Sequence, residues 1–327
     1  MRFPRAQGLV CLILVAAACG NREERTRAPE PATVEGLGAL PAESKILIGV
    51  NVARFADSTL VRRQIGRLLA EDPSLGTRVN ALLEACKIDP AKDLETVHVG
   101  IVEDGKTYVM VVRGNLEEAR LVGCIRESLS SSETTLETRM VSNAPAYVAR
   151  DGAGTERGWF AFGGPRVLIV ASTEAWLVRA RDPSAPKVSG AGDMMGLVHR
   201  TDTKKALWAA GHLPERIAKA VVDVTSGIVK APPTGAWGHF EAGHDGLDLE
   251  ANLEMATPED AVGLVGFGKK QLDYLDGIAQ AQRIGPQVAK IKLANSGNVA
   301  KLSLKLTAQE LHELEAQLDK GKEGTTP

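Results

Sequence analysis

A small group of histidine and acidic residues in the second half of the chain has the chemistry of a metal site. His239 and Glu241 are separated by one residue in an alternating segment, so a strand would place both side chains on one face. His244 lies in the turn that follows, and His212 comes at the end of an earlier predicted strand. Imidazole and carboxylate groups are common zinc ligands, and a site with three of them would leave a position open for water.

The spacing of these residues is not that of a helical zinc motif, and polar residues are expected beside the Asp-Gly turn at 245–246. We therefore predict hydrogen-bonded or solvated strand histidines, with no metal, no catalytic residues and no cofactor. Gly190, Gly192 and Gly196 have no strand before them that would make a phosphate-binding loop. The segment from Ser189 also lacks the Gly-x-Ser-x-Gly pattern of a hydrolase nucleophile.

The composition is that of a globular body without a marked charge. The chain has 327 residues, of which 44% are hydrophobic and 24% charged, and its formal net charge is -2 at pH 7. This balance provides no basic surface for nucleic acid, so we exclude that class of partner. Aromatic residues make up only 4% of the chain, so we expect a core of small aliphatic side chains and no sugar-stacking platform.

The N-terminal segment that ends at Cys19 has the order of an export signal. Arg2 and Arg5 begin it, an apolar stretch follows from Gly8 to Val15, and three alanines precede Cys19. Such a stretch is too short to span a bilayer. The segment resembles the lipobox of bacterial lipoproteins, in which the cysteine becomes the lipidated first residue. The alternative is a plain secretory signal that is cut after the alanines.

This resemblance implies that residues 1–18 are a signal peptide and that Cys19 carries a diacylglyceryl thioether and an acylated amine, with fatty acids such as palmitate. More than one acyl chain gives durable membrane anchoring. The resemblance also implies a cell-envelope location, and the absence of Asp at position 20 favours the outer membrane, with the body facing the periplasm or the cell surface. The remaining body resembles envelope lipoproteins in general style.

Segments without apolar periodicity divide the mature chain. Residues 19–44 are rich in charged residues and proline and are expected to form the lipid anchor and a flexible tether. Residues 183–192 contain prolines, serines and glycines and are expected to be a linker. These boundaries predict a first repeat at 45–182, a second repeat at 193–320 and a disordered tail at 321–327.

The two halves of the chain repeat one another. Each half has an Asp-Gly turn between two alternating segments, at 104–105 and at 245–246, which is a strong hairpin signal. A helix-capping residue follows each hairpin, Asn115 in the first half and Thr257 in the second. The number of residues between the two hairpins is nearly the same as the number between the two caps, as a repeat requires. Each half is therefore predicted to contain, in this order, a strand, a helix, a hairpin, a helix, a second hairpin and a final helix.

A second pair of strands follows in each half, at 158–162 and 167–171 in the first and at 288–293 and 299–306 in the second. The first half has an additional strand pair near 136–149. This order predicts an α+β protein made of two tandem repeats, each a mainly antiparallel sheet with helices packed on one face. The order suits the split strand-helix-strand, or ferredoxin-like, arrangement.

Two cysteines remain in the mature body after Cys19. Cys86 and Cys124 each lie on the apolar stripe of a predicted helix. In an oxidising compartment the pair can form a disulfide if the two helices share one sheet face. Two separate buried thiols are the alternative, because a free cysteine packs well in a core.

These observations favour a non-catalytic envelope lipoprotein that binds another envelope component, with an unknown small-molecule ligand or none. The alternative is an envelope enzyme or ligand binder with a site between the repeats, formed near residues 182–192 and the hairpin of His239. A third class is a carrier of an apolar ligand.

Overall fold

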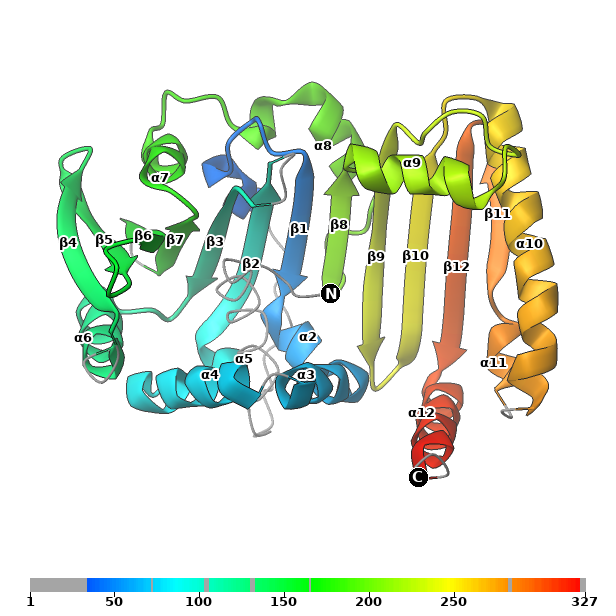
Figure 1. Ribbon diagram of the computed structural model, residues 1–327, viewed down its shortest axis with the longest axis horizontal. Helices are drawn as coiled ribbons and strands as arrows, with labels where there is room; N and C mark the ends of the chain where they lie inside the picture. Colours follow the sequence, from blue (N-terminus) through cyan, green and yellow to red (C-terminus); the bar gives the residue numbers. More distant parts are fainter. Residues whose placement is uncertain are drawn as a thin grey trace. The chain divides into compact units, whose positions relative to one another are not determined.

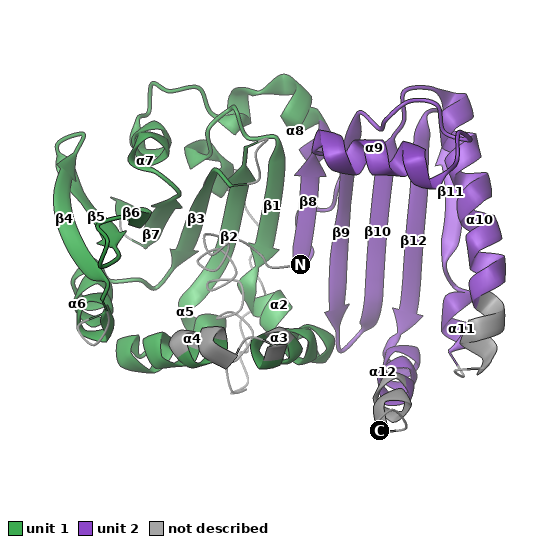
Figure 2. Ribbon diagram, viewed as in Figure 1, with its two compact units in different colours: residues 1–196 green, residues 197–327 purple. Residues whose placement is uncertain are grey.

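The computed structural model describes residues 34–71, 73–102, 106–129, 133–164, 166–281 and 284–323. The chain divides into two compact units, residues 1–196 and 197–327 (Figure 2). The predicted signal peptide and Cys19 lie outside the described residues, as does the turn at 104–105. None of the described helices combines the length and the apolar character needed to cross a membrane.

The first unit contains strands and short helices in alternation (Figure 1). Its elements are η1 (Val34–Ala39), β1 (Ile46–Asn51), α2 (Val52–Asp57), α3 (Thr59–Glu71), α4 (Pro73–Cys86), α5 (Pro90–Asp93), β2 (Leu94–Ile101), β3 (Tyr108–Gly114), α6 (Glu118–Leu129), β4 (Thr135–Val141), β5 (Ala144–Arg150), β6 (Glu156–Gly164), β7 (Val167–Ala171), α7 (Glu174–Arg181) and η2 (Val188–Gly190). Helix α8 (Gly192–Val198) leads into the second unit.

The second unit repeats this alternation with longer helices at its C-terminal end (Figure 1). Its elements are β8 (Leu207–Gly211), α9 (Glu215–Val224), β9 (Gly235–Gly243), β10 (Gly246–Glu254), α10 (Pro258–Ala281), α11 (Gly285–Val288), β11 (Lys292–Ser296), β12 (Val299–Thr307) and α12 (Ala308–Glu323).

Corresponding strands have the same order in the two units. The first unit has the order β1-β2-β3-β7-β6, to which β5 and β4 are added, and the second unit has the order β8-β9-β10-β12-β11. The pairings within each unit are antiparallel. The α+β class is therefore confirmed, and the shared strand order supports the repeat that the sequence predicts. The pair β4 and β5 is the additional pair expected near residues 136–149.

The ferredoxin-like order within each repeat is corrected. Strands β1 and β2 are connected through helices, yet they are direct antiparallel neighbours, with Ile48 opposite Val99. A split strand-helix-strand unit would instead make the two connected strands parallel and place another strand between them. Periodicity along the chain identifies the strands but not their neighbours, which explains the difference.

The sheet of the first unit is covered on both faces, not on one as the sequence predicts. On one face Tyr147 of β5 donates a hydrogen bond of 2.7 Å to Oε1 of Glu118 in α6. On the other face η1 packs so closely on β2 that a Cβ atom at Gly36 would overlap the imidazole of His98. Burial lowers the pKa of His98 to about 4, so this imidazole is neutral at pH 7.

The expected tether and linker are shorter than the sequence predicts. Leu37 and Leu40 are fully buried in the first unit, so residues 34–44 are part of the folded body. In the predicted linker, Val188 is fully buried and its N–H donates to the carbonyl of Leu40 at 2.9 Å. Both segments look polar in sequence because only isolated apolar residues attach them to the body.

The sheet of the second unit has two different faces. Alternating residues of β9, β10 and β12 form an apolar face that consists of Phe240, Leu249, Leu253, Ala300, Leu302 and Leu304. Helix α10 packs on this face, where Ala261 and Val265 join a buried cluster with Met255 and Ala300. The intervening residues form what we call the charged face, which consists of His239, Glu241, Asp248, Glu250, Lys301 and Lys305.

Local sequence signals account for several element boundaries. The hydroxyl of Thr257 accepts from the N–H of Asp260 at 3.1 Å, so it caps α10 as predicted. Thr307 and Glu310 form a reciprocal capping box at the start of α12. The strand predicted at 288–293 is wrong, because α11 ends at Val288 and β11 begins at Lys292. Helix α6 begins at Glu118, three residues after the predicted cap at Asn115.

A disulfide joins two helices of the first unit. Cys86 at the end of α4 and Cys124 in α6 are bridged, with their Cα atoms 5.1 Å apart. Both residues are buried, so the bridge lies in the core beside Leu121 and Val122. Of the two alternatives that the sequence leaves open, the structure therefore has the disulfide and not two separate thiols.

Gly246 starts β10 with a φ of 115°, a conformation that glycine adopts readily and other residues rarely adopt. A Cβ atom there would also overlap the carbonyl of Leu306 on β12. We expect Gly246→Ala to lower the free energy of unfolding by about 2 kcal/mol or more.

Gly243→Ala is the matched control, because Gly243 ends β9 in the same turn and a Cβ atom there has no neighbour within 4 Å. Chemical denaturation of both variants measures the difference. Equal losses for the two variants would contradict the role of Gly246.

Candidate functional site

The charged face of the second unit brings together ionisable side chains from β9, β10 and β12. On β10, every second residue is acidic or an amide, from Asp248 through Glu250 and Asn252 to Glu254. Strand β12 places Lys305 opposite Asp248 and Lys301 opposite Asn252. Because cross-strand neighbours are only about 5 Å apart, opposite charges on these strands attract each other.

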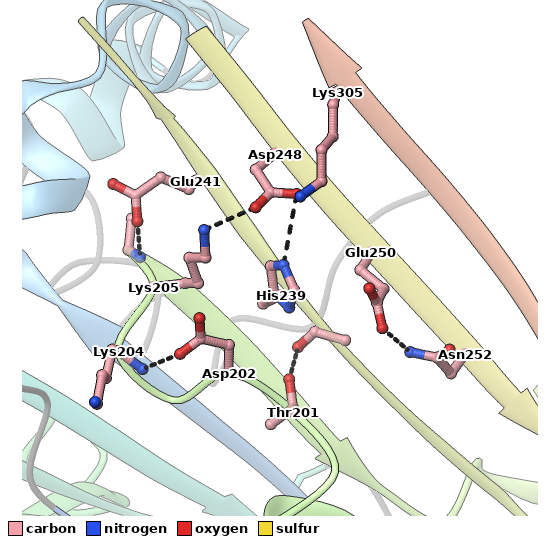
Figure 3. Close-up of polar contacts among 12 residues, drawn as sticks. Thr201, Asp202, Lys204, Lys205, His239, Glu241, Asp248, Glu250, Asn252 and Lys305 are labelled. Atoms are coloured by element: carbon pink, nitrogen blue, oxygen red, sulfur yellow. Dashed lines mark hydrogen bonds and ion pairs between the residues drawn. The ribbon is translucent and has the colours of Figure 1, made fainter. Parts of the chain in front are cut away.

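Asp248 is the centre of this group. Lys205 donates a hydrogen bond of 2.7 Å to its carboxylate, and Lys305 Nζ lies 3.6 Å from the other carboxylate oxygen. The Nε2 atom of His239 lies 3.7 Å from the same oxygen. Figure 3 shows the two lysines approaching Asp248 from two sides, with the imidazole beside it. Burial alone would raise the pKa of Asp248, but the lysine hydrogen bond and the neighbouring positive charges outweigh it and lower the pKa.

Glu250 repeats this arrangement one position further along the face. Its carboxylate accepts from Lys301 Nζ at 2.6 Å and from the side-chain amide of Asn252 at 3.0 Å. Burial opposes ionisation here as well, but the bonds from Lys301 and Asn252 and the charge of Lys301 lower the pKa of Glu250. The carboxylates of Asp248 and Glu250 therefore both stay ionised over the physiological range of pH.

The segment between α8 and β8 supplies one side of the site. Thr201 donates its hydroxyl to the carbonyl of Gly238 at 2.8 Å, which attaches the segment to β9. Glu241 accepts from the N–H of Ala206 at 2.9 Å, and the ion pair of Lys205 then reaches across β9 to Asp248. The segment is held at both ends, so Lys205 is positioned for Asp248 before any partner binds.

The far end of β10 carries a separate pair. Arg200 donates to the carboxylate of Glu254 at 2.7 Å, and its guanidinium lies 5.0 Å from the ring centre of Trp237. An arginine that is stacked and paired in this way loses little further freedom when it contacts a partner. The charged face thus extends along the whole length of β10.

The four residues predicted as weak metal candidates do not come together. His239 and Glu241 share the charged face as predicted, but Glu241 is bonded to the backbone of Ala206. His244 lies at the hairpin tip, where its side chain is 84% exposed, and Nδ1 of His212 donates to the carbonyl of Thr234 at the other end of β9. Among the residues that the structure describes, no group of three or more His, Cys, Asp or Glu side chains has metal-binding geometry.

Sequence reasoning missed Asp248, Glu250, Lys205, Lys301 and Lys305. The signal for the two acids was the alternation of β10, where apolar residues occupy the odd positions and polar residues the even ones. The lysines of β12 follow the same pattern, because an apolar residue stands on each side of Lys301 and of Lys305 in the sequence. Lys205 had no signal, because it lies in an irregular segment whose position only the tertiary structure provides.

One hollow of about 250 Å³ lies in the described part of the first unit, lined by Glu43, Arg179, Ala185 and Pro186. An ion pair between Arg179 and Glu43 crosses it. Two of these residues belong to the predicted linker, which the sequence placed near a ligand site. The volume is below the range of about 300–1,000 Å³ that is usual for small-molecule sites.

Comparison with known proteins shows the fold alone. No protein-family model and no curated protein matches this chain. Among solved structures, crystal form I of TP0453 is similar, with a TM-score of 0.50 and 11% identity over 88% of this chain and 98% of that chain. Crystal form III of TP0453 has a TM-score of 0.51 and 10% identity over 88% of this chain and 99% of that chain. The α+β arrangement of most of the chain thus occurs in a second sequence of very low identity.

The ion pairs of Asp248 lead to a prediction about stability. Its side chain is 21% exposed and its folded-state pKa is lowered, so its contribution is present above the unfolded pKa, about 3.9, and is lost as the pH falls through the folded value. We expect Asp248→Asn to lower the free energy of unfolding by about 1 to 2 kcal/mol at pH 7.

The difference from the wild type should shrink as the pH falls from the unfolded pKa through the lower folded pKa, because the wild-type carboxylate is then neutral as well. Asp245→Asn is the control, because Asp245 is 92% exposed in the hairpin turn and Asn-Gly suits the same turn. Urea denaturation across this pH range is the measurement. A loss for Asp248→Asn that does not change with pH would show that the ion pairs are not its cause.

Proposed function

We propose that this chain is a non-catalytic, lipid-anchored cell-envelope protein that binds another envelope protein through the charged face of its second unit. The observation that carries this proposal is the stripe of ionised carboxylates on β10 with exposed lysines beside it. Lys305 is 76% exposed and still lies 3.6 Å from Asp248, so it can contact a partner without leaving its ion pair. Mixed charges of this kind give specificity and register in a protein interface.

Binding suits this face better than catalysis. A general base near neutral pH needs a pKa near 7, but the pKa values of Asp248 and Glu250 are shifted in the opposite direction. Both carboxylates are also occupied by lysine ammonium groups. The two carboxylates therefore provide fixed charges for recognition, and neither of them is poised to accept a proton near pH 7.

The partner that fits is a protein with acidic and basic groups of its own. Positive groups on the charged face are Lys205, Lys301 and Lys305, and the negative groups are Glu241, Asp248 and Glu250, so the two signs are balanced. A balanced surface is not attracted to the uniform negative charge of nucleic acid. It recognises a surface with the complementary alternation, and its binding weakens as salt screens the charges.

The membrane part of the proposal rests on the N-terminal sequence. The order of Arg2, Arg5, the apolar stretch and Cys19 supports export and lipidation, and an outer-membrane location follows from the same resemblance. A lipid anchor would hold the charged face close to other envelope proteins, so even a weak contact would be occupied.

The anchor is tested by the intact mass of the protein from membrane and soluble fractions of its own host. We expect a mass that corresponds to cleavage before Cys19 plus acyl chains, found in the membrane fraction. Cys19→Ala should remove the acyl mass and move the protein out of that fraction. A wild-type protein that is cleaved but carries no acyl chain would overturn the lipoprotein assignment.

The charged face is tested by a photo-crosslinking residue at Ser303, which lies between Lys301 and Lys305 on β12. We expect a defined crosslinked protein in the envelope, and a severalfold loss of it when Lys305→Glu is added or when the salt is raised from about 0.15 M to 0.5 M.

The matched control is the same crosslinking residue at Glu313, an exposed position on α12 outside the charged face. Crosslinking that is equal at Ser303 and Glu313, or unaffected by Lys305→Glu, would reject the charged face as the interface.

A carrier of an apolar ligand is the second candidate function, and one observation favours it. On the apolar face of the second unit Phe240, Leu249 and Leu302 are only half-buried, and Ala251 is exposed, so α10 does not cover this face completely. An acyl chain could occupy such a surface. The mass measurement separates the two candidates, because a carrier would retain a non-covalent lipid on the Cys19→Ala protein.

A further inference from the structure

Strand β4 (Thr135–Val141) is an edge strand of the first unit. It pairs with β5 along its whole length, from Thr135 opposite Arg150 to Val141 opposite Ala144. Within the described residues no strand pairs with its other side, and Figure 1 shows β4 as the last strand of that sheet. The outward N–H and C=O groups of such a strand can pair with another chain.

The edge formed by β4 is exposed to solvent, and its sequence does not fully protect it against pairing with another strand. Met140 is 70% exposed, which is unusual for a large apolar side chain at a sheet edge. Glu137 and Arg139 are also partly exposed and carry opposite charges. Strand β4 contains no proline, and its register with β5 has no bulge, although both features commonly protect edge strands against pairing.

The residues of β4 are complementary to themselves when the strand is reversed. In an antiparallel pair of two β4 strands centred on Thr138, each Glu137 lies opposite the Arg139 of the other copy. Leu136 lies opposite Met140 in the same register, and Thr138 lies opposite Thr138. Charge pairs therefore occur on one face of the joined sheet and apolar pairs on the other, and each of these pairs is favourable between neighbouring strands.

We propose that β4 is a dimerisation edge and that its partner is a second copy of this chain, paired antiparallel about Thr138. The interface is isologous, because the same strand is used by both copies and the two-fold axis closes the assembly. The sheets of the two first units join through β4.

The charges on β4 are already held in place for this contact. The Glu137 carboxylate forms an ion pair with Arg150, whose Nε lies 3.2 Å away, and Arg139 lies 3.5 Å from Glu156 and 5.5 Å from the ring centre of Trp159. These interactions keep both side chains along the strand, so little rotamer freedom is lost on pairing. In the dimer, Glu137 and Arg139 gain a partner across the axis without giving up Arg150 and Glu156.

Strand β11 (Lys292–Ser296), the edge of the second unit, provides a contrast. Reversed about its central Ala294, it places Lys292 opposite Ser296 and Leu293 opposite Asn295. Neither pair joins two opposite charges or two apolar side chains. Self-complementarity is thus a property of the β4 sequence and not of edge strands in this chain generally.

Cysteine crosslinking tests the register directly. In the proposed dimer the two copies of residue 138 are about 5 Å apart between Cα atoms, which is within disulfide reach. The two copies of residue 135 are roughly 20 Å apart, because each is three positions from the axis and on opposite sides of it. We expect full-length Thr138→Cys protein to form a 138–138 disulfide under mild oxidation, identified by peptide mass spectrometry, and Thr135→Cys to form none. Equal crosslinking at both positions would overturn the register.

A charge swap tests the same contact without a covalent bond. Sedimentation of the full chain should show a concentration-dependent dimer, and Glu137→Arg or Arg139→Glu should raise its dissociation constant about tenfold by placing like charges opposite each other. The double variant, Glu137→Arg with Arg139→Glu, should return to within a few-fold of the wild type.

The swap also controls for folding, since the double variant changes the local ion pairs as much as the single variants do. Recovery in the double variant supports the contact. A wild-type chain that stays monomeric at about 100 μM, together with no 138–138 disulfide, overturns the proposal. A ladder of higher species would overturn the isologous form.

Discussion

The register of β10 with its two neighbours decides what both faces of the second unit can do. Leu249 lies opposite Phe240 on β9 and Leu304 on β12, so the apolar residues of all three strands come to one face. The same register places Asp248 between Glu241 and Lys305 on the other face. A shift of a single residue would send every one of these side chains to the wrong side. The positive φ of Gly246 and the capping of α10 and α12 at the strand ends support this register.

The parts of the fold that depend on neighbours in sequence could be predicted. The Asp-Gly turn before β10 and the cap at Thr257 are local signals, and they occur where they were expected. The predicted strand at 288–293 failed because a short apolar run does not separate a strand from a helical turn. The packing of Leu37 and Leu40 against β2 could not be seen either, since it depends on contacts with residues far along the chain.

The candidate site shows the same division. That His239 and Glu241 share a face follows from their spacing alone, and it was predicted. That Asp248 lies between Lys205 and Lys305 requires the pairing of β10 with β12 and the course of the segment before β8. No pattern within one segment contains this information. The sequence draws notice to the histidines because imidazole groups can bind metals. The electrostatics of the face are determined instead by the lysine–carboxylate pairs.

The two units have the same strand order but use it differently, and the difference lies in what covers the sheet. In the first unit, residues 34–44 cover the face that α6 leaves open, a disulfide joins α4 to α6, and β2 and β3 are buried on both sides. Burial on both sides removes apolar area from water and therefore favours stability. In the second unit the segment before β8 is attached to one part of the charged face through Thr201 and Ala206, and the rest of that face presents ion-paired side chains. The two units thus share a strand order but differ in the polarity of one sheet face, and the charges on that face need ionic partners or contact with water.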